Sequence, residues 1–171
     1  MDAAGTREAM IGKGRKFFGL SRCRVFERPG DWLETSPFGE RVHPVTGGKS
    51  FHAGSDGAVW TGFGLGESWI VAPLSGTVAA ARDGVPGRDD SRPEGNFVEI
   101  DHGGGVRTRY LHLECGTVAV RAGCSVAAGE RLGYMGASGR ATGEHLHFEL
   151  RVRGEPVDPA PFLRGEGVGQ R

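Results

Sequence analysis

Short apolar segments that alternate with glycine-containing turns restrict the fold of this chain more than any other feature. Segments of about four to eight residues, rich in β-branched and aromatic residues and bounded by turn residues, are typical of strands. Strands are therefore predicted over residues 68–72, 76–82, 97–101, 106–113, 117–120, 131–134 and 145–152. No segment of about ten residues or more has the 3.6-residue period of an amphipathic helix. The sequence predicts an all-β, single-domain protein in which antiparallel strands are joined by hairpins.

The glycine content supports this fold class. The 171 residues include 31 glycines, which are dispersed rather than regularly spaced. This pattern is typical of many tight turns, and it argues against both a collagen repeat and disorder. The polar segment 84–95 is predicted to be a surface loop. The chain is long enough for one domain with a hydrophobic core and a short additional segment.

The charge balance excludes some classes of partner. The chain has 21 basic and 21 acidic residues, so its net charge does not favour nucleic acid or an anionic membrane. No apolar run approaches the roughly 18 residues that a membrane-spanning helix needs. Met1–Leu20 lacks the apolar region and the cleavage site of a secretory signal. We therefore expect a monomer without a membrane span, whose export would use a route that this chain does not encode.

The first 30 residues are predicted to be a short N-terminal extension, followed by the main domain over residues 31–163 and a flexible tail over residues 164–171. Met1–Arg28 holds seven basic residues against three acidic ones. The simpler interpretation is a frayed tail that leads into a short strand over residues 22–26. The alternative is a connection to another module or a contact with an anionic polymer.

The three cysteines are Cys23, Cys115 and Cys124, and they contain no CxxC pair. A thiolate zinc site is therefore not expected. Cys115 and Cys124 could face each other across a hairpin and form a disulfide. The preferred interpretation is that they are reduced and partly buried, because no secretory signal is visible.

Two histidines in one apolar segment give the strongest indication of function. His145 and His147 lie two residues apart in a predicted strand, so their side chains lie on the same face. A buried histidine is costly unless it holds a metal, a proton or an anion. Further members of such a site are available upstream in His52, Asp56 and His112.

The spacing of these residues fits one zinc ion per chain. Zinc accepts imidazole nitrogen and carboxylate oxygen in a four-coordinate arrangement, and a catalytic zinc keeps one position for water. His52 and Asp56 are four residues apart, and the glycines beside them let the backbone turn so that both side chains reach one point. A third ligand would come from the strand that carries His145 and His147.

His112 is predicted to face a groove. In a regular strand Leu111 and Leu113 point to the core, while Tyr110 and His112 point to the opposite face. The alternative is a core histidine with a satisfied hydrogen bond. The remaining histidines, His43 and His102, lie in predicted turns and are expected to be structural or solvated.

Several motifs in order resemble the lysostaphin-type (LytM-like) zinc endopeptidases, cell-wall hydrolases of bacteria and their phages with the duplicated hybrid motif fold. The similarity extends from about Ser36 to Leu163. The matching motifs are Phe38–Pro44, His52–Asp56, Ala72–Val78, Gly95–Gly103, Thr108–Leu113, Thr142–Glu149 and Val157–Pro159.

The resemblance implies a role for each candidate residue. His52, Asp56 and His147 would bind the zinc ion, whereas His112 and His145 would line the cleft and assist catalysis. A zinc-bound water would attack a peptide carbonyl of peptidoglycan, so the substrate would be a wall peptide and the site of action the cell wall, in the periplasm, outside the cell or with a phage. Which of the two assisting histidines acts as the base, and which peptidoglycan bond is cut, stay open.

Three departures from the family pattern carry expectations of their own. Ser55 and Gly57 flank Asp56 where the family usually has apolar residues, so this strand is expected to pack loosely. Glu144 adds a carboxylate before the histidine pair, and we expect it to be a solvated loop residue rather than a partner of a histidine. The loop over residues 84–95 is long, and it could reshape the substrate groove.

Three other functions compete with a hydrolase. Some members of the fold have lost zinc ligands and act as silent peptidoglycan-binding or activator modules, but all five site residues are present here. Residues 72–78 and 126–132 also resemble biotinyl or lipoyl carrier domains, which need a lysine at a hairpin tip. No lysine lies in such a place, since the lysines are Lys13, Lys16 and Lys49. A sugar-transport phosphocarrier would bring two histidines together, but it does not account for Asp56 as well as zinc does.

Overall fold

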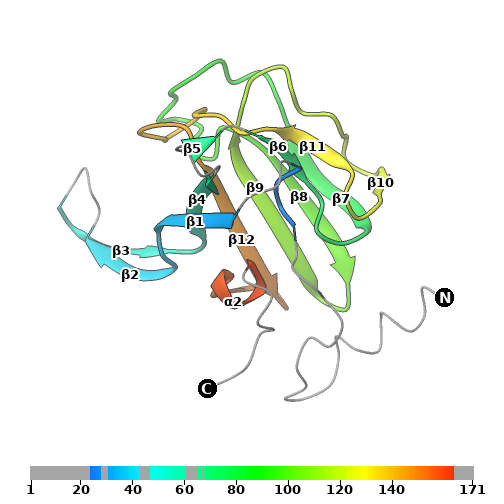
Figure 1. Ribbon diagram of the computed structural model, residues 1–171, viewed down its shortest axis with the longest axis horizontal. Helices are drawn as coiled ribbons and strands as arrows, with labels where there is room; N and C mark the ends of the chain where they lie inside the picture. The colour runs from blue at the N-terminus through cyan, green and yellow to red at the C-terminus, as the bar shows by residue number, and fades with distance from the viewer. Residues whose placement is uncertain (1–23, 28–30, 43–46, 61–64, 67, 164–171) are drawn as a thin grey trace.

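The computed structural model describes residues 24–27, 31–42, 47–60, 65–66 and 68–163. In these residues the chain forms short strands joined by turns, with one helix, α2 (Ala160–Leu163), after the last strand (Figure 1). The strands are β1 (Asp31–Ser36), β2 (Gly39–Val42), β3 (Lys49–His52), β4 (Ser55–Trp60), β5 (Leu65–Gly66), β6 (Trp69–Val71), β7 (Gly76–Arg82), β8 (Asn96–Gly103), β9 (Val106–Leu113), β10 (Ser125–Val126), β11 (Arg131–Tyr134), β12 (Leu146–Val152) and β13 (Glu155–Val157).

One large antiparallel sheet dominates the fold. It contains nine strands, of which seven follow the order β1-β4-β12-β9-β8-β7-β10, while β5 pairs with β4 and β13 pairs with β12. Two smaller sheets consist of β6 with β11 and of β2 with β3. In Figure 1 the long strands β8, β9 and β12 lie side by side, with β4 next to β12. The predicted all-β, antiparallel fold class is confirmed.

Most of the predicted strands are present, and one is absent. β7, β9 and β11 have the predicted bounds, while β6, β8 and β12 differ from theirs by one or two residues at an end. The prediction of a strand over residues 117–120 was wrong. Val118 and Val120 do pack against the core there. The backbone of this segment, however, makes only one hydrogen bond to β11, from Ala119 N–H to Leu132 O at 2.9 Å.

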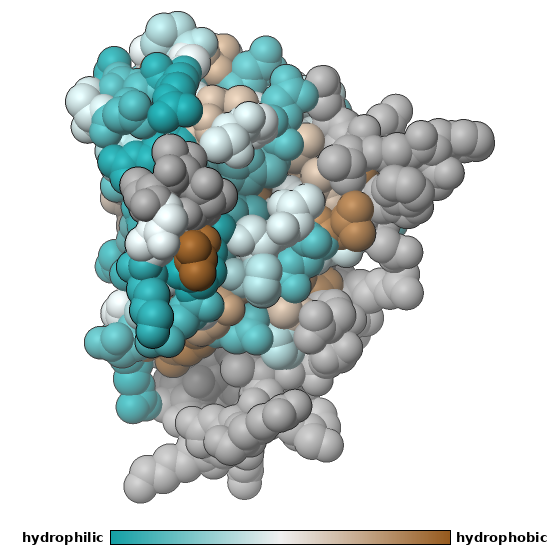
Figure 2. All heavy atoms as spheres, turned by 90° about the vertical axis from the view of Figure 1, so that its left-hand side faces the viewer, coloured by the Kyte–Doolittle hydropathy of each residue, from teal (hydrophilic) through white to brown (hydrophobic). Residues whose placement is uncertain are grey.

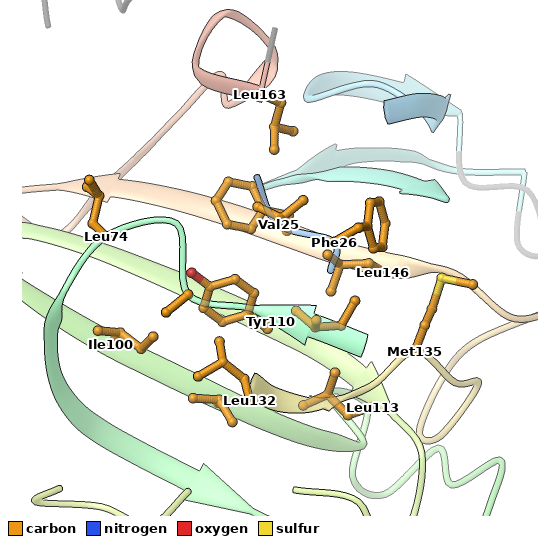
Figure 3. Close-up of a cluster of buried hydrophobic side chains, with 14 of the residues drawn as sticks. Val25, Phe26, Leu74, Ile100, Tyr110, Leu113, Leu132, Met135, Leu146 and Leu163 are labelled. Carbon is orange, nitrogen blue, oxygen red and sulfur yellow. The ribbon is translucent and has the colours of Figure 1, made fainter. Parts of the chain in front are cut away.

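The core lies between the main sheet and the β6–β11 pair. Side chains from β8, β9 and β12 meet Ile70 of β6 and Leu132 of β11, which are fully buried. Figure 3 shows Tyr110 and Leu113 of β9 pointing into this cluster together with Leu146 of β12. Full burial of such a side chain contributes about 1.5–3 kcal/mol relative to exposure, so these strands hold the domain together.

Residues before β1 also belong to this core. Val25 and Phe26 are buried in the same cluster, and Phe26 forms a β-bridge with Ile70. The N–H of Val71 donates to the Val25 carbonyl at 2.9 Å. Of the short strand predicted over residues 22–26, the described residues 24–26 form a single bridge at Phe26, and residues 22 and 23 lie outside the described residues. The domain boundary at residues 30 and 31 stays a prediction.

The β2–β3 hairpin lies at one side of the sheet, beside β1 and β4 (Figure 1). The Phe38 and Phe51 rings meet edge to face beside it, with centroids 5.1 Å apart. Figure 2 views the molecule from this side, and hydrophilic side chains predominate among those coloured. Val42 and Phe51 are nevertheless 66% and 57% exposed, so the hairpin presents apolar side chains to solvent.

The two cysteines among the described residues form no disulfide. Cys115 and Cys124 are free thiols, as preferred from the sequence, but both are exposed rather than partly buried. Cys23 lies outside the described residues.

Among the described residues, no helix has the length and apolar character that crossing a membrane requires.

Candidate metal centre

Three strands, β3, β4 and β12, bring His52, Asp56 and His147 together. β3 ends at His52 and a two-residue turn leads into β4, which carries Asp56. β4 pairs with β12 in a register that places Asp56 directly opposite His147. Directly opposed residues of an antiparallel pair have side chains on the same face, about 4.5–5.5 Å apart at Cβ. The sheet register therefore sets this cluster.

The three inner atoms of the cluster are close enough to share one ion. His52 Nε2 lies 3.1 Å from Asp56 Oδ1 and 3.0 Å from His147 Nδ1, and His147 Nδ1 lies 2.7 Å from Asp56 Oδ1. In a tetrahedral zinc site with bonds of 2.0–2.1 Å, ligand atoms are separated by about 3.3 Å. Two imidazole nitrogens and one carboxylate oxygen also make a donor set that zinc accepts. The residues present therefore fit such an ion.

The outer nitrogens of both histidines are already engaged. His52 Nδ1 donates to the Pro37 carbonyl at 2.7 Å, because a carbonyl oxygen can only accept. His147 Nε2 donates to Glu149 Oε1 at 3.3 Å. With the outer nitrogen donating in each ring, the inner nitrogen can present its lone pair to an ion.

The glycine before Asp56 allows the close approach of two strands. A Cβ on Gly54 would lie 2.5 Å from the Phe148 carbonyl and 2.8 Å from His147 Nε2. Gly54 is absent from the residues with positive φ, so glycine is required here by contact rather than by a special turn conformation. A larger residue would push β12 and its histidine away from β4.

The strand that carries Asp56 packs tightly, and the expectation of loose packing was wrong. The Ser55 side chain is fully buried, and its hydroxyl donates to Glu34 Oε1 at 2.6 Å. Gly57 lies directly under the Trp32 indole, which would collide with a Cβ at this position. The small residues around Asp56 thus let β1 cover β4 closely, which holds the ligand strand in place.

His145 and His112 lie beside the metal cluster. His145 precedes β12, and its Nε2 is 3.7 Å from Asp56 Oδ1. Its Nδ1 donates to the Gly143 carbonyl at 2.8 Å, and His112 Nδ1 donates to the Ser138 carbonyl at 2.8 Å. The two rings lie 4.9 Å apart between centroids. Each ring therefore keeps Nε2 as the nitrogen that does not bond to a carbonyl.

The predicted orientation is confirmed for His112, which lines the groove, and for Leu113, which lies in the core, but it was wrong for Tyr110 and Leu111. Tyr110 and Leu113 are the residues in the core (Figure 3), while Leu111 and His112 line the groove. His112 has a φ of 65°, and the β8–β9 register shifts between Val98–Tyr110 and Asn96–Leu113. A bulge with this backbone breaks the two-residue alternation, so neighbouring side chains share a face.

A groove of about 1210 Å³ surrounds the cluster. All five predicted site residues line it, and so does the exposed Glu144. The loop over residues 84–95 contributes Arg88, Asp90, Pro93 and Glu94 to the wall, so its predicted influence on the groove is confirmed.

Burial and neighbouring groups set the charges in the site. Burial opposes ionisation of Asp56, but the imidazoles of His147 and His52 beside it outweigh burial and hold the pKa of Asp56 far below its usual range. Burial, followed by the nearby His145 and His147, lowers the pKa of His112 to about 4. Asp56 is therefore a carboxylate and His112 a neutral imidazole at neutral pH.

Glu149 is a site residue that the sequence reasoning missed. It is buried two residues after His147, bonds to that ring, and pairs with Arg109 at 3.1 Å and Arg151 at 2.7 Å. Burial opposes its ionisation, but the bond from His147 and the charge of Arg109 outweigh it and lower the pKa of Glu149 to about 2. The two-residue spacing that linked His145 to His147 extends to Glu149 and could have identified it.

Arg41 was also missed. It belongs to the β2–β3 hairpin, and its Nη1 lies 3.6 Å from Asp56 Oδ2. The same nitrogen donates to Ser36 Oγ at 2.5 Å. The motif over residues 38–44 contains this arginine, so the sequence held a signal that was not used. Arg41 places a positive charge beside the outer oxygen of the aspartate.

The other histidines behave differently. His102 uses both ring nitrogens within the fold, bonding to the Ser75 carbonyl at 2.9 Å and to Thr108 Oγ1 at 2.7 Å. Its predicted structural role is confirmed. His43 lies outside the described residues.

An all-β domain with this donor set and two further imidazoles in one groove has the features of a metal-dependent hydrolase. The chain belongs to peptidase family M23, whose sequence model matches residues 50–159. The predicted resemblance to lysostaphin-type endopeptidases and the predicted enzyme class are thereby confirmed.

Individual relatives extend this result. Peptidoglycan DD-endopeptidase ShyA of Vibrio cholerae serotype O1 is 40% identical over 145 residues, which cover 82% of this chain but 30% of the relative. The crystal structure of a zinc-containing peptidase from Vibrio cholerae is 36% identical, with a TM-score of 0.60, and covers 79% of this chain and 39% of that one. The catalytic domain of lysostaphin from Staphylococcus simulans is 26% identical, with a TM-score of 0.59, over 78% of this chain and 92% of that domain. The chain thus spans about 30% of the length of the curated relative.

Proposed function

We propose that this chain hydrolyses peptide bonds in bacterial peptidoglycan at the cell wall, with one zinc ion held by His52, Asp56 and His147. The observation that carries the proposal is the convergence of these three donors with His112 and His145 on one groove. The Vibrio cholerae relatives support the substrate and the metal, since one is named a peptidoglycan DD-endopeptidase and another a zinc-containing peptidase.

The chemistry divides between the ion and the chain. A zinc ion supplies Lewis acidity to a peptide carbonyl and lowers the pKa of water towards neutrality. The chain would hold the ion through three side chains, of which the two histidines have their outer nitrogens fixed by hydrogen bonds. Asp56 stays ionised, which favours a cation at this point.

His112 and His145 supply proton transfer and stabilise developing charge. A neutral imidazole accepts a proton at Nε2 from attacking water, and a protonated imidazole donates from the same atom to the carbonyl oxygen or the leaving amine. Neutral His112 suits the first task. Removal of one donor to such an oxygen costs about 2.7–4 kcal/mol in other hydrolases. All five residues come from one chain, so a monomer holds the complete site.

The decisive experiment incubates the purified chain with peptidoglycan and identifies the released fragments by mass spectrometry. We expect new amino termini, loss of their release after chelation, and recovery when zinc is added back. Release that is indifferent to the chelator would overturn the proposal. Fragment masses would also assign the bond that is cut.

The competing function is a silent peptidoglycan-binding or activator module of the same fold. The same experiment separates the two, because such a module would bind peptidoglycan without metal and would release no new amines when loaded with zinc. The presence of all five site residues supports the hydrolase.

A further inference from the structure

The backbone at His112 adopts a conformation that a histidine rarely takes. Its φ of 65° lies in the left-handed region, which is unfavourable for a residue with a side chain. Such a backbone persists only where the surroundings fix it from several sides. The groups that fix it here are on both sides of the residue: the His112 N–H donates to the Glu94 carbonyl at 3.1 Å, and the next carbonyl, that of Leu113, accepts two bonds.

Ser138 holds His112 through two different groups. Its hydroxyl donates to the Leu113 carbonyl at 2.6 Å, and its own carbonyl accepts the His112 Nδ1–H at 2.8 Å. The same hydroxyl accepts the backbone N–H of Asn96 at 2.9 Å. Ser138 is buried, so water does not compete for these bonds. One residue therefore contacts both the backbone and the ring that it positions.

Asn96 completes the arrangement. Its side-chain nitrogen donates to the carbonyls of Val85 and Leu113 at 2.9 and 3.0 Å, and its side-chain oxygen accepts the Val85 N–H at 2.8 Å. The residue is fully buried, and every polar atom of its amide is used. An apolar residue of similar size would leave these backbone groups unpaired, which is costly in a buried place.

Two glycines allow the serine to approach. A Cβ on Gly95 would overlap Ser138, and a Cβ on Gly139 would overlap the backbone of Gly95. Both glycines have positive φ. Close backbone contact of this kind requires glycine on both sides. The Gly-Asn pair that opens the motif over residues 95–103 is thus explained by what it does for His112.

We infer that Asn96 and Ser138 are positioning residues for His112, and that they keep its proton on Nδ1 so that the Nε2 lone pair faces the groove. The inference rests on the proposed catalytic role of His112. It adds that the Ser138 carbonyl, rather than a carboxylate, holds the ring in one tautomer. The Ser138 hydroxyl and the Asn96 amide hold the Leu113 carbonyl, which follows His112 in the chain.

The first test needs no change in the fold. Nitrogen-15 spectra of the zinc-loaded chain, labelled at histidine and recorded at one pH, distinguish a protonated Nδ1 from a protonated Nε2. The signals of His112 are identified by their absence in His112→Gln. We expect the Nδ1–H tautomer alone. A protonated Nε2, or signals averaged between the two forms, would overturn the inference.

The second test removes the serine hydroxyl. For Ser138→Ala we expect kcat to fall by about tenfold to a hundredfold, because small misplacements of catalytic groups have effects of this size. KM and the zinc content should stay as in the unchanged chain, and the His112 signals should show both tautomers. An unchanged kcat with a single tautomer would contradict the inference, as would a loss of zinc in proportion to the loss of activity.

A glycine pair provides a matched comparison if Ser138→Ala does not fold. Gly139→Ala and Gly129→Ala both place alanine at positive φ, but only Gly139 meets other atoms, whereas a Cβ on Gly129 has none within 4 Å. We expect Gly139→Ala to lower kcat and disturb the His112 tautomer, and Gly129→Ala to change neither. Equal effects of the two would overturn the inference.

Failure of the proposed function can be distinguished from failure of the positioning inference. If His112→Ala keeps full activity, the catalytic role of His112 fails, but the tautomer in the unchanged chain still tests whether Ser138 positions the ring.

Discussion

The two faces of β12 are buried to a similar degree by opposite means. Leu146, Phe148 and Leu150 point to one face and are fully buried in the apolar core. His147 and Glu149 point to the other face and are also buried, but their neighbours are charged or polar. The alternation of a strand places these two environments one residue apart.

The neighbouring strands repeat this division. Phe148 pairs across the sheet with Tyr110, which pairs with Val98, whereas Glu149 pairs with Arg109, which pairs with Glu99. The side chains of the first row are buried through contact between apolar groups. Those of the second row can be buried only because each charge meets an opposite charge. Burial of charge without such partners is strongly unfavourable. The apolar face therefore determines whether the strand folds, while the polar face determines what it can bind.

The largest effect is expected when a metal ligand is removed from the polar face of β12. For His147→Ala and for Asp56→Ala we expect loss of zinc and of hydrolysis, because two remaining donors hold zinc poorly. The chain should still fold, since the opposite face of β12 is unchanged. Metal analysis and circular dichroism check both statements, and equal zinc in Asp56→Ala and the unchanged chain would refute the ligand assignment.

Two other histidines are the controls for this prediction. His145→Ala should keep zinc and lose about a hundredfold or more in activity, which is typical of a lost proton-transfer group. His102 lies outside the groove, so His102→Ala should keep zinc. Loss of zinc in both controls would mean that histidine removal acts through general unfolding.

The apolar face should respond in the opposite way. Phe148 contacts Tyr110, with ring centroids 5.4 Å apart, and stacks on Phe162 of α2 at 6.0 Å. Phe148→Ala should lower the free energy of unfolding by about 3–5 kcal/mol, because it leaves a cavity in the core. Urea denaturation measures this, and the fraction that stays folded should bind zinc normally. A loss below about 1 kcal/mol would mean that the core can collapse around the gap.

Much of this division could be predicted from the sequence. The strict alternation from residue 145 onward placed His145 and His147 on one face, and the order of motifs linked them to His52 and Asp56. β7, β9 and β11 followed from their apolar pattern because each contributes side chains to the hydrophobic core. These are features that depend on local spacing, which a sequence displays directly.

The parts that escaped prediction depend on contacts between distant residues. A positive φ at His112 cannot be read from a histidine, since it is imposed by Ser138, 26 residues later. Residues 117–120 look like a strand because their side chains pack on the core, but their backbone lacks a continuous partner. β1 to β5 are short and partly polar, so their pattern is weak. The two-residue spacing from His147 indicated Glu149, but the charge of Glu149 in this buried place depends on its ion pair with Arg109, which lies in another strand.

A smaller effect is expected when Glu149, the partner of a metal ligand on the polar face, loses its charge. Glu149→Gln keeps the shape of the side chain but removes its charge, so the outer nitrogen of His147 loses a strong acceptor. We expect zinc affinity to fall by about 10–100-fold, the usual effect of losing a partner of a metal ligand. Competition with a chelator of known affinity measures it.

Glu99→Gln is the matched control, because Glu99 pairs with the same Arg109 without touching His147. Its zinc affinity should equal that of the unchanged chain. If both variants weaken zinc binding alike, Glu149 acts by holding the arginine and not the histidine.

The smallest effect is expected at the outer end of the same face. Arg151 donates to Glu149 Oε2 at 2.7 Å, but the Arg151 side chain is 30% exposed. Water therefore replaces much of the interaction that is lost when this arginine is removed. Arg151→Ala should lower the free energy of unfolding by about 0.5–1 kcal/mol, as for other partly exposed ion pairs, and should leave zinc affinity unchanged. Arg107→Ala, on the neighbouring strand and more exposed, should have a similar or smaller effect. A loss of zinc affinity in Arg151→Ala as large as in Glu149→Gln would mean that the charges of this face act as one unit, because neutralising any member would then release the others.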